Sequence, residues 1–434
     1  MAKTKAKPKT KAISRAKKAA PGTAKKLAKP AKTTVKQHPA PKGTSKAIAK
    51  TKKKPSANKP KTGPETKIKA TMKKKTPAPA KAAPKKAVET KAQQEAPAPA
   101  KSVAARTKGS LLDRDFLIAL AEAIRVVVQP AIDASKGREV IGNAASGDAT
   151  FQLDRLAERA LLTFLRDAKL PVAYYSEDSG YTTFTSGQPE HLLVIDPIDG
   201  TRAAKSGFEW CVIAIGSTRV IERPRLGDID NALVMELMGS RAFYAERGKG
   251  ARVYVDGQYR KPKLSKNTDL ETVVWSMTVP ARPAELIFPT AAKLIDLTSL
   301  KGGFYACNST SYSLTRLLTN QLDACVDIAN RFYRDIPKAV QDHFINAGRG
   351  AILGIAPYDI AASLLIAEEA GCVVTDAYGK SLRDVLLLDS ATGNHQSMVA
   401  AANAELHEKL LTFFDMRIQQ WEQLLRRHED RPSA

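Results

Sequence analysis

The sequence of 434 residues contains no run of 18 apolar residues and only four cysteines. The first absence argues against a membrane-spanning helix, which needs about 20 predominantly apolar residues. Cys211, Cys307, Cys325 and Cys372 include no close pair and have no histidine at metal-ligand spacing, so we expect buried free thiols in a reducing compartment. The N-terminus lacks the apolar segment of a secretory signal, and we expect a cytoplasmic protein.

Residues 1–108 contain no phenylalanine, tyrosine or tryptophan. They hold 33 of the 69 lysines and arginines and 13 of the 25 prolines, but only three acids. Such a segment buries too little apolar surface to offset the entropy of ordering, so we expect a disordered basic tail. Its net charge is +30, whereas residues 109–434 hold 36 basic and 41 acidic residues, a net charge of −5. The basic character of the chain therefore belongs to the tail alone.

The tail resembles linker-histone tails in composition. Its charge predicts weak, non-specific binding of nucleic acid or another polyanion, with strong dependence on salt. The lack of aromatic residues argues against base stacking. The alternative is a solubilising segment with no partner, and the composition leaves both interpretations open.

Residues 109–434 are long enough for a sizeable core and show the periodicities of both helices and strands. Helices are expected at 116–128, 153–164, 286–297, 312–318 and 361–370, and strands at 172–175, 192–195, 211–216, 232–237, 241–245, 273–277, 322–328 and 372–374. This mixed order predicts a layered α+β fold. We divide it into an N-terminal α+β half at about 109–260 and a C-terminal α/β half at about 261–434.

Three acidic clusters follow or open these elements: residues 177–178 (Glu-Asp), residues 196–201 (Asp-Pro-Ile-Asp-Gly-Thr), and Asp359. Mg²⁺ prefers hard oxygen ligands, so carboxylates that converge on one cleft are typical of a divalent-metal phosphatase. The Gly-Thr pair would open the next turn, where free backbone N–H groups face a phosphate. Each cluster alone would be an ordinary turn or helix cap, but together they favour metal binding.

Residues 176–179 (Ser-Glu-Asp-Ser), 196–201, 357–362 (Pro-Tyr-Asp-Ile-Ala-Ala) and 369–372 (Glu-Ala-Gly-Cys) have the order and separation of a known set of motifs. Over about residues 110–415 the chain resembles the inositol monophosphatase family of Mg²⁺-dependent, lithium-sensitive phosphatases. The resemblance implies the layered αβαβα sandwich of the inositol monophosphatase and fructose-1,6-bisphosphatase type. It also implies two or three Mg²⁺ ions and allows a homodimer.

Residue by residue, the resemblance implies a ligand set for the metal ions. Glu177, Asp196 and the Ile198 carbonyl would hold one Mg²⁺, and Asp196, Asp199 and Asp359 would hold the second. In that arrangement metal-bound water attacks phosphorus in line, and no covalent phosphoenzyme is needed.

The resemblance also assigns catalytic and substrate-binding roles. The Thr201 hydroxyl would lie close to the attacking water, and Asp154 would support both from behind, although it could instead pair with a neighbouring arginine on a solvated face. Contacts with the phosphate or substrate are implied for Asp199, Gly200, Thr201 and Ser309. Glu177 is counted with Thr201 and Asp154 as catalytic.

The sequence differs from the family at positions expected to contact the substrate. Residues 202–205 (Arg-Ala-Ala-Lys) replace the usual Asn-Phe pair, and Ile352 replaces a glutamate that contacts inositol hydroxyls. Residues 327–352 contain an insertion that forms either a substrate-reading lid or a surface helix or oligomer contact. His343 and His395 have no ligand partners at useful spacing and are expected to be structural.

These observations predict hydrolysis of a small phosphate monoester, such as an inositol or sugar phosphate. One alternative is a 3′(2′),5′-bisphosphate nucleotidase, and another is an inactive nucleic-acid-associated protein. The amphipathic run at 406–425 packs either within the chain or between subunits.

Overall fold

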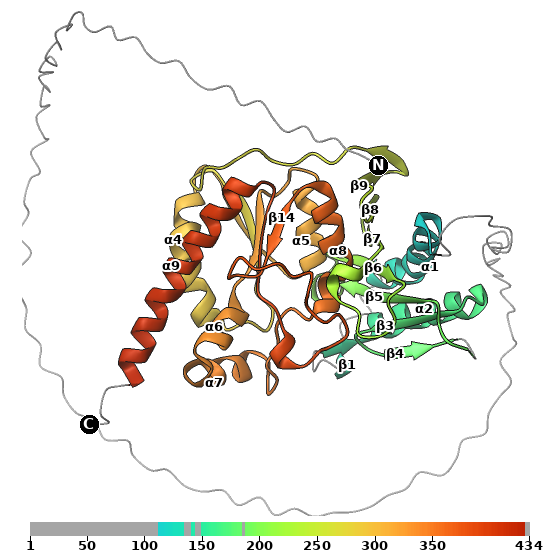
Figure 1. Cartoon of the computed structure of the whole chain (residues 1–434), viewed down its shortest axis with the longest axis horizontal. Helices are drawn as coiled ribbons and strands as arrows, with labels where there is room; N and C mark the ends of the chain where they lie inside the picture. The colour runs from blue at the N-terminus through green and yellow to red at the C-terminus, as the bar shows by residue number, and fades with distance from the viewer. Residues whose placement is uncertain (1–111, 134–139, 144–148, 185–186, 430–434) are drawn as a thin grey trace, which may run out of the picture. The chain divides into compact units, whose positions relative to one another are not determined.

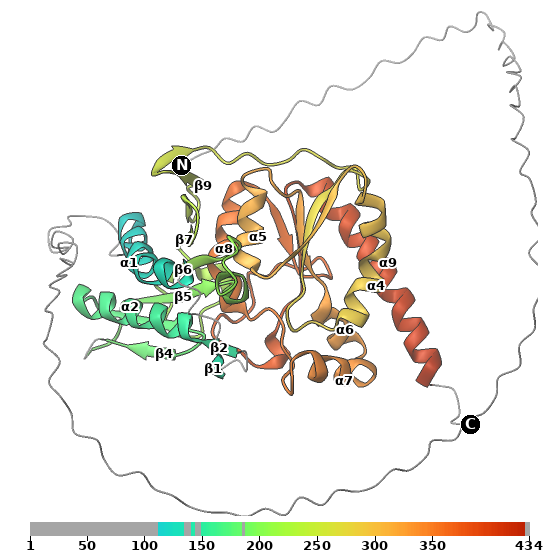
Figure 2. The same cartoon turned by 180° about the vertical axis from the view of Figure 1, so that it is seen from behind.

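The computed structural model describes residues 112–133, 140–143, 149–184 and 187–429, so the expected basic tail lies outside the described residues. The described residues all fall in one compact unit, Gln94–Ala434. Figure 1 and Figure 2 show helices and sheets stacked as helix, sheet, helix, sheet, helix. The predicted layered α+β class is confirmed.

The first sheet has eight strands in the order β10-β9-β8-β7-β6-β5-β3-β4. The strands are β3 (Val172–Ser176), β4 (Gly180–Thr183), β5 (His191–Asp199), β6 (Val212–Thr218), β7 (Asn231–Glu236), β8 (Arg241–Glu246), β9 (Ala251–Val255) and β10 (Gln258–Arg260). Only β3 and β5 pair in parallel. Along β5, Leu192 and Val194 join the core between the sheets, while Leu193 and Ile195 join the core beneath α1 (Arg114–Asp133) and α2 (Gln152–Ala168). Both faces of β5 are therefore buried.

The second sheet has five strands in the order β12-β11-β13-β15-β14. The strands are β11 (Val274–Thr278), β12 (Gly303–Cys307), β13 (Ala324–Asp327), β14 (Val373–Thr375) and β15 (Met398–Ala401). Helices α4 (Ala284–Thr298) and α9 (Ala404–Glu429) cover its outer face (Figure 1). The apolar face of α9 enters this core through Leu406, Leu410, Phe413, Phe414 and Ile418. Of the two alternatives for the C-terminal run, the structure therefore shows packing within the chain.

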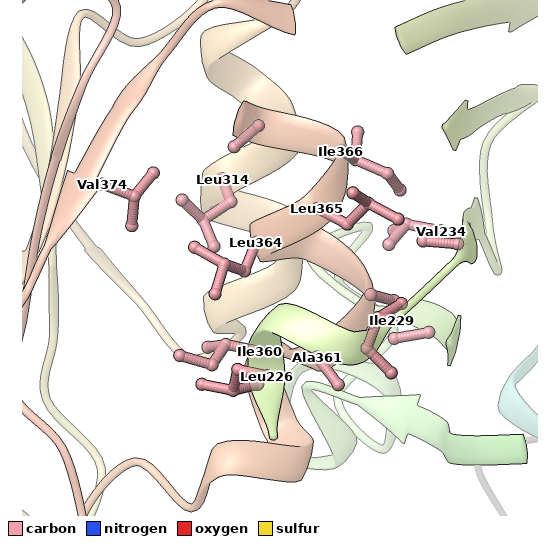
Figure 3. Packing of buried hydrophobic residues seen from close by; sticks show 14 of the residues in the cluster. Leu226, Ile229, Val234, Leu314, Ile360, Ala361, Leu364, Leu365, Ile366 and Val374 are labelled. Carbon is pink, nitrogen blue, oxygen red and sulfur yellow. The ribbon is translucent and has the colours of Figure 1, made fainter. Parts of the chain in front are cut away.

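The central layer consists of α5 (Thr310–Leu317) and α8 (Pro357–Ala370). Helix α8 is apolar on all sides, because one side packs on each sheet. Figure 3 shows Leu364 on the side that faces Leu314 and Val374, and Ile366 on the side that faces Val234. The helix begins with Pro357 and ends at Gly371, whose φ is 96°. This rigid central helix carries Asp359 in its first turn.

Shorter elements complete the fold. They are β1 (Val140–Asn143), β2 (Ala149–Phe151), α3 (Thr201–Ala204), the 3₁₀ helices Leu226–Asp228 and Thr392–Asn394, α6 (Ala329–Asp335) and α7 (Pro337–Ala347). The insertion expected at 327–352 forms α6 and α7, which bury Phe332, Val340 and Phe344 in the outer core. Residues 329–332 of α6 are buried, whereas α7 is a surface helix that packs on the domain through one face, in line with the surface-helix alternative.

The four cysteines are buried and free, as predicted. Within the described ranges, no helix has the length and apolar content needed to cross a membrane.

Candidate active site

The four carboxylates expected to bind Mg²⁺ line one cavity of about 110 Å³, together with Ile198. Glu177 follows β3 and Asp196 lies near the end of β5, and these two strands are parallel neighbours, so their ends meet at one edge. Asp196 pairs with Ala214 and Asp199 with Val212 of β6, and the register shifts between these two pairs, so the strand bulges at the two residues that separate the aspartates. Asp359 reaches the same cavity from the first turn of α8.

Burial raises the pKa values of the three aspartates of the cavity, and repulsion by neighbouring carboxylates adds to this for Asp196 and Asp359. Burial, followed by the charges of Asp199, Glu177 and Asp359, raises the pKa of Asp196 well above its usual range. Burial raises the pKa of Asp199 to about 6, although a hydrogen bond from the Ser311 backbone N–H, 2.7 Å away, acts in the opposite direction. Burial, Glu177 and Asp199 also raise the pKa of Asp359. Such crowding of anionic groups is relieved by a bound cation.

The donor set fits a hard divalent ion, since it consists of carboxylate and carbonyl oxygens. The Ile198 N–H donates to Asp196 Oδ1 and the Ala356 N–H donates to Asp359 Oδ2, both at 3.0 Å, and this orients each carboxylate while leaving its second oxygen. In the part of the chain that the structure describes, no three His, Cys, Asp or Glu side chains are already grouped to hold an ion.

Thr201 and Asp154 lie together at the edge of this cavity. The Thr201 hydroxyl is 3.1 Å from Asp154 Oδ1 and 3.0 Å from the Ile198 carbonyl oxygen. A hydroxyl has one proton, so it donates to one of these acceptors at a time. The structure thus pairs Asp154 with Thr201, across 47 positions in the sequence.

Gly200 is required by the turn that joins β5 to α3. Its φ is 96°, and a Cβ atom at this position would lie 2.4 Å from the Trp210 carbonyl oxygen. Gly200→Ala is therefore expected to lower the free energy of unfolding by about 2–4 kcal/mol, because left-handed strain adds to steric overlap. Gly207→Ala is the matched control: Gly207 has φ of 76° but open space around it, so about 1 kcal/mol is expected. Urea denaturation checks this, and equal losses in both variants would contradict it.

Ser309, for which a substrate contact is expected, does not line the cavity. It is fully buried as the N-cap of α5, where its Oγ accepts a hydrogen bond from the Tyr312 N–H at 3.0 Å. A hydrogen bond from its side chain also helps to lower the pKa of Asp199. Its neighbours Asn308 and Thr310 line the cavity instead. In this structure Ser309 acts on a carboxylate of the site.

Glu158, which the sequence analysis did not single out, supports the segment that carries Glu177. Its Oε1 accepts hydrogen bonds from the hydroxyls of Tyr174 at 3.2 Å, Ser176 at 2.9 Å and Ser179. The side chain is buried on α2, one turn after Asp154. The sequence could have indicated this role only through the four-residue spacing of Asp154 and Glu158, which places both on one face of α2.

Glu158→Leu is expected to raise the Mg²⁺ concentration for half-maximal activity about tenfold, because residues that orient metal ligands affect metal affinity on this scale. Glu158→Gln keeps an acceptor oxygen and should change it less than about threefold. Activity measured against Mg²⁺ concentration provides the test. A loss of stability in Glu158→Leu with an unchanged Mg²⁺ requirement would assign the residue to folding alone.

Two further side chains line the cavity although the sequence analysis did not predict a role for them in the site. His395, expected to be structural, lines the cavity, as does Arg282. Ile352 packs against the outer core, while its neighbours Leu353 and Gly354 line the cavity. Ile352, the residue expected to replace the inositol-contacting acid, therefore does not line the cavity. No sequence pattern indicated that His395 and Arg282 would line it, because the two residues are far apart along the chain and far from the acidic motifs.

Most of the chain that the structure describes matches one family model. The inositol monophosphatase family model covers residues 113–419, which include every carboxylate of the cavity. The chain belongs to the inositol monophosphatase family. This family is generally Mg²⁺-dependent and acts on small phosphorylated substrates, and its phosphatases are phosphoric monoester hydrolases.

The relatives of this chain include proteins named for several different phosphatase activities. A bifunctional NADP phosphatase/NAD kinase of Methanococcus maripaludis is 25% identical over 314 residues, which are 70% of this chain and 49% of that protein. The chain thus spans about half the length of this relative. A fructose-1,6-bisphosphatase/inositol-1-monophosphatase of Methanothermobacter thermautotrophicus is 24% identical over 303 residues, 68% of this chain and 93% of that protein. The solved structure of an inositol monophosphatase–fructose 1,6-bisphosphatase aligns with a TM-score of 0.51 and 21% identity, over 69% of this chain and 98% of that chain, and shows the shared fold.

Proposed function

We propose that this protein is a Mg²⁺-dependent phosphatase that hydrolyses a small phosphate monoester, such as a sugar or inositol phosphate, by attack of water. The observation that carries the proposal is that four carboxylates and Thr201 line one cavity, and that the Thr201 hydroxyl is hydrogen-bonded to Asp154. Membership of the inositol monophosphatase family supports it.

The residues divide into two ligand groups. Glu177, Asp196 and the Ile198 carbonyl would hold one Mg²⁺, and Asp196 would share the second with Asp199 and Asp359, in a site for two or three ions. When bound, Mg²⁺ lowers the pKa of water and offsets charge on the phosphate and the leaving oxygen.

The chain's own groups orient the reactants. Thr201 Oγ accepts the proton of the attacking water while its own proton passes to Asp154 Oδ1, which lies within hydrogen-bond distance. The phosphate lies against Gly200 and Thr201 at the start of α3, beside Asp199. In this assignment Ser309 contributes through Asp199 and not by direct contact.

The two other functions predicted from the sequence differ in their support. A 3′(2′),5′-bisphosphate nucleotidase uses the same carboxylates and differs only in its leaving group. An inactive nucleic-acid-associated protein would have no need to keep the full set of site residues, which is intact here. Binding of a polyanion by residues 1–108, a homodimer and a cytoplasmic location stay predictions.

The test is phosphate release by the full chain from a panel of sugar, inositol and nucleotide phosphates. We expect turnover of at least one monoester with Mg²⁺, loss of activity in EDTA, and inhibition by Li⁺. No turnover across the panel, or turnover that persists in EDTA, would refute the proposal.

A further inference from the structure

Ser311, near the start of α5, contacts both of the segments that carry the ligands of the second proposed Mg²⁺ ion. Its backbone N–H donates to Asp199 Oδ2 at 2.7 Å, and its Oγ donates to the Asp359 carbonyl oxygen at 2.9 Å. These contacts join positions that are 112 and 48 residues apart in the sequence. Ser311 therefore links the end of β5 to the first turn of α8, although it does not itself line the cavity.

The Ser311 hydroxyl belongs to a buried pair of hydroxyl groups. Its Oγ lies 3.0 Å from Ser363 Oγ on α8, and neither residue is exposed to solvent. The other acceptor within reach of the Ser363 hydroxyl, the Ile360 carbonyl, is farther away at 3.4 Å. Because each hydroxyl has one proton, both find their nearer acceptor when Ser363 donates to Ser311 and Ser311 donates to the Asp359 carbonyl. The pair thus fixes α5 against the turn of α8 that carries Asp359.

Helix α5 is held at both of its ends. At its start, Ser309 caps the helix by accepting a hydrogen bond from the Tyr312 N–H at 3.0 Å. At its end, Arg316 forms a buried ion pair with Glu236 of β7, across 2.7 Å. Between these ends, Leu314 packs on the side of α8 that carries Leu364 (Figure 3). Ser311 is therefore held in one position relative to both the first sheet and α8.

From these contacts, and resting on the two-ion site proposed above, we propose that Ser311 is a positioning residue that fixes the spacing of Asp199 and Asp359 and thereby favours Mg²⁺ at the second site. Mg²⁺ requires near-ideal octahedral geometry at about 2.0–2.1 Å, so its binding depends on ligands whose spacing is fixed. Ca²⁺ accepts about six to eight ligands in flexible geometry at about 2.3–2.6 Å and depends on that spacing less. Loss of the link weakens Mg²⁺ binding selectively, whereas a general loss of helix packing weakens the binding of both ions.

Calorimetric titration of the full chain with Mg²⁺ and, separately, with Ca²⁺ tests the inference without any turnover. In Ser311→Ala we expect the dissociation constant of one Mg²⁺ step to rise about tenfold, which is the scale on which residues that orient ligands affect metal affinity. The other Mg²⁺ step and the binding of Ca²⁺ should change less than about threefold, because Glu177 and Asp196 keep their positions and Ca²⁺ adapts to the changed spacing.

Two further variants separate the link from the loss of a buried hydroxyl. Ser313→Ala is the matched control, because Ser313 lies on the same helix, is 2% exposed, and donates only to the Ser309 carbonyl, at 2.8 Å. Its Mg²⁺ and Ca²⁺ affinities should equal those of the parent protein. Ser363→Ala removes the partner of Ser311 on α8 but keeps the contacts with Asp199 and Asp359, so it should weaken the same Mg²⁺ step by about threefold, less than Ser311→Ala does.

The outcomes also separate this inference from the proposed phosphatase. If the parent protein binds no Mg²⁺, the metal site and the inference both fail. If the parent binds Mg²⁺ but Ser311→Ala binds it equally well, the inference fails while the phosphatase proposal stands. Equal weakening of Mg²⁺ and Ca²⁺ in Ser311→Ala, or the same loss in Ser313→Ala, also overturns the inference, because either result assigns Ser311 to packing alone.

Discussion

Replacement of Asp196 by asparagine is expected to lower kcat/KM for phosphate release by about a thousandfold or more, because metal ions contribute several kcal/mol of charge stabilisation to such reactions. Asp196 is the carboxylate on which both proposed metal sites depend, and the three other acids of the cavity act on its charge. The same change removes one of four crowded carboxylates. Without metal, the variant should therefore melt about 2–4 °C higher than the parent protein.

A loss of activity together with a higher melting temperature would distinguish a metal ligand from a residue that only stabilises the fold. Mg²⁺ should raise the melting temperature of the parent protein and raise that of Asp196→Asn less, because binding to the native state stabilises it. Asp178→Asn is the matched control: it lies two residues after Ser176, is exposed, and does not line the cavity. Unchanged turnover in Asp196→Asn would refute the proposed site.

Glu236→Gln is expected to lower the free energy of unfolding by about 3–5 kcal/mol, because it leaves the buried charge of Arg316 uncompensated. Arg316 Nη1 lies 2.7 Å from Glu236 Oε1, and both side chains are at most 5% exposed. The guanidinium also lies over the rings of Tyr312 and Phe243, at 4.2 and 5.1 Å from their centroids. The pair joins β7 to α5, the helix whose Ser311 N–H binds Asp199.

Urea denaturation of the full chain measures this effect. The double variant Glu236→Gln/Arg316→Met should recover at least half of the loss, since it removes both charges and keeps an apolar contact with the rings. Glu271→Gln, which breaks the exposed contact with Lys301, should leave the unfolding midpoint unchanged. A double variant no more stable than Glu236→Gln would show that the ion pair itself does not account for the loss.

The sequence predicted those helices and strands in which the spacing of apolar residues matches the residues that are buried. The helical spacing at 153–164 corresponds to α2, and the apolar run at 192–195 to β5. Edge elements were missed: β10 is exposed at all three of its residues and therefore has no apolar pattern to detect. The helices of the insertion were missed as well, because α6 has only seven residues and its buried set includes Asn330 and Arg331.

The sequence by itself determined the acidic motifs, their order, and through them the family and the type of reaction. This was possible because each motif is contiguous and lies at the end of an element that burial makes periodic, as Asp196 does on β5. Only the tertiary structure brought Glu158 under the Glu177 segment, turned Ile352 toward the outer core, and placed Arg282 and His395 at the cavity. Those contacts join positions tens to more than a hundred residues apart, and no local spacing encodes them, since they arise when separate layers of the fold pack together.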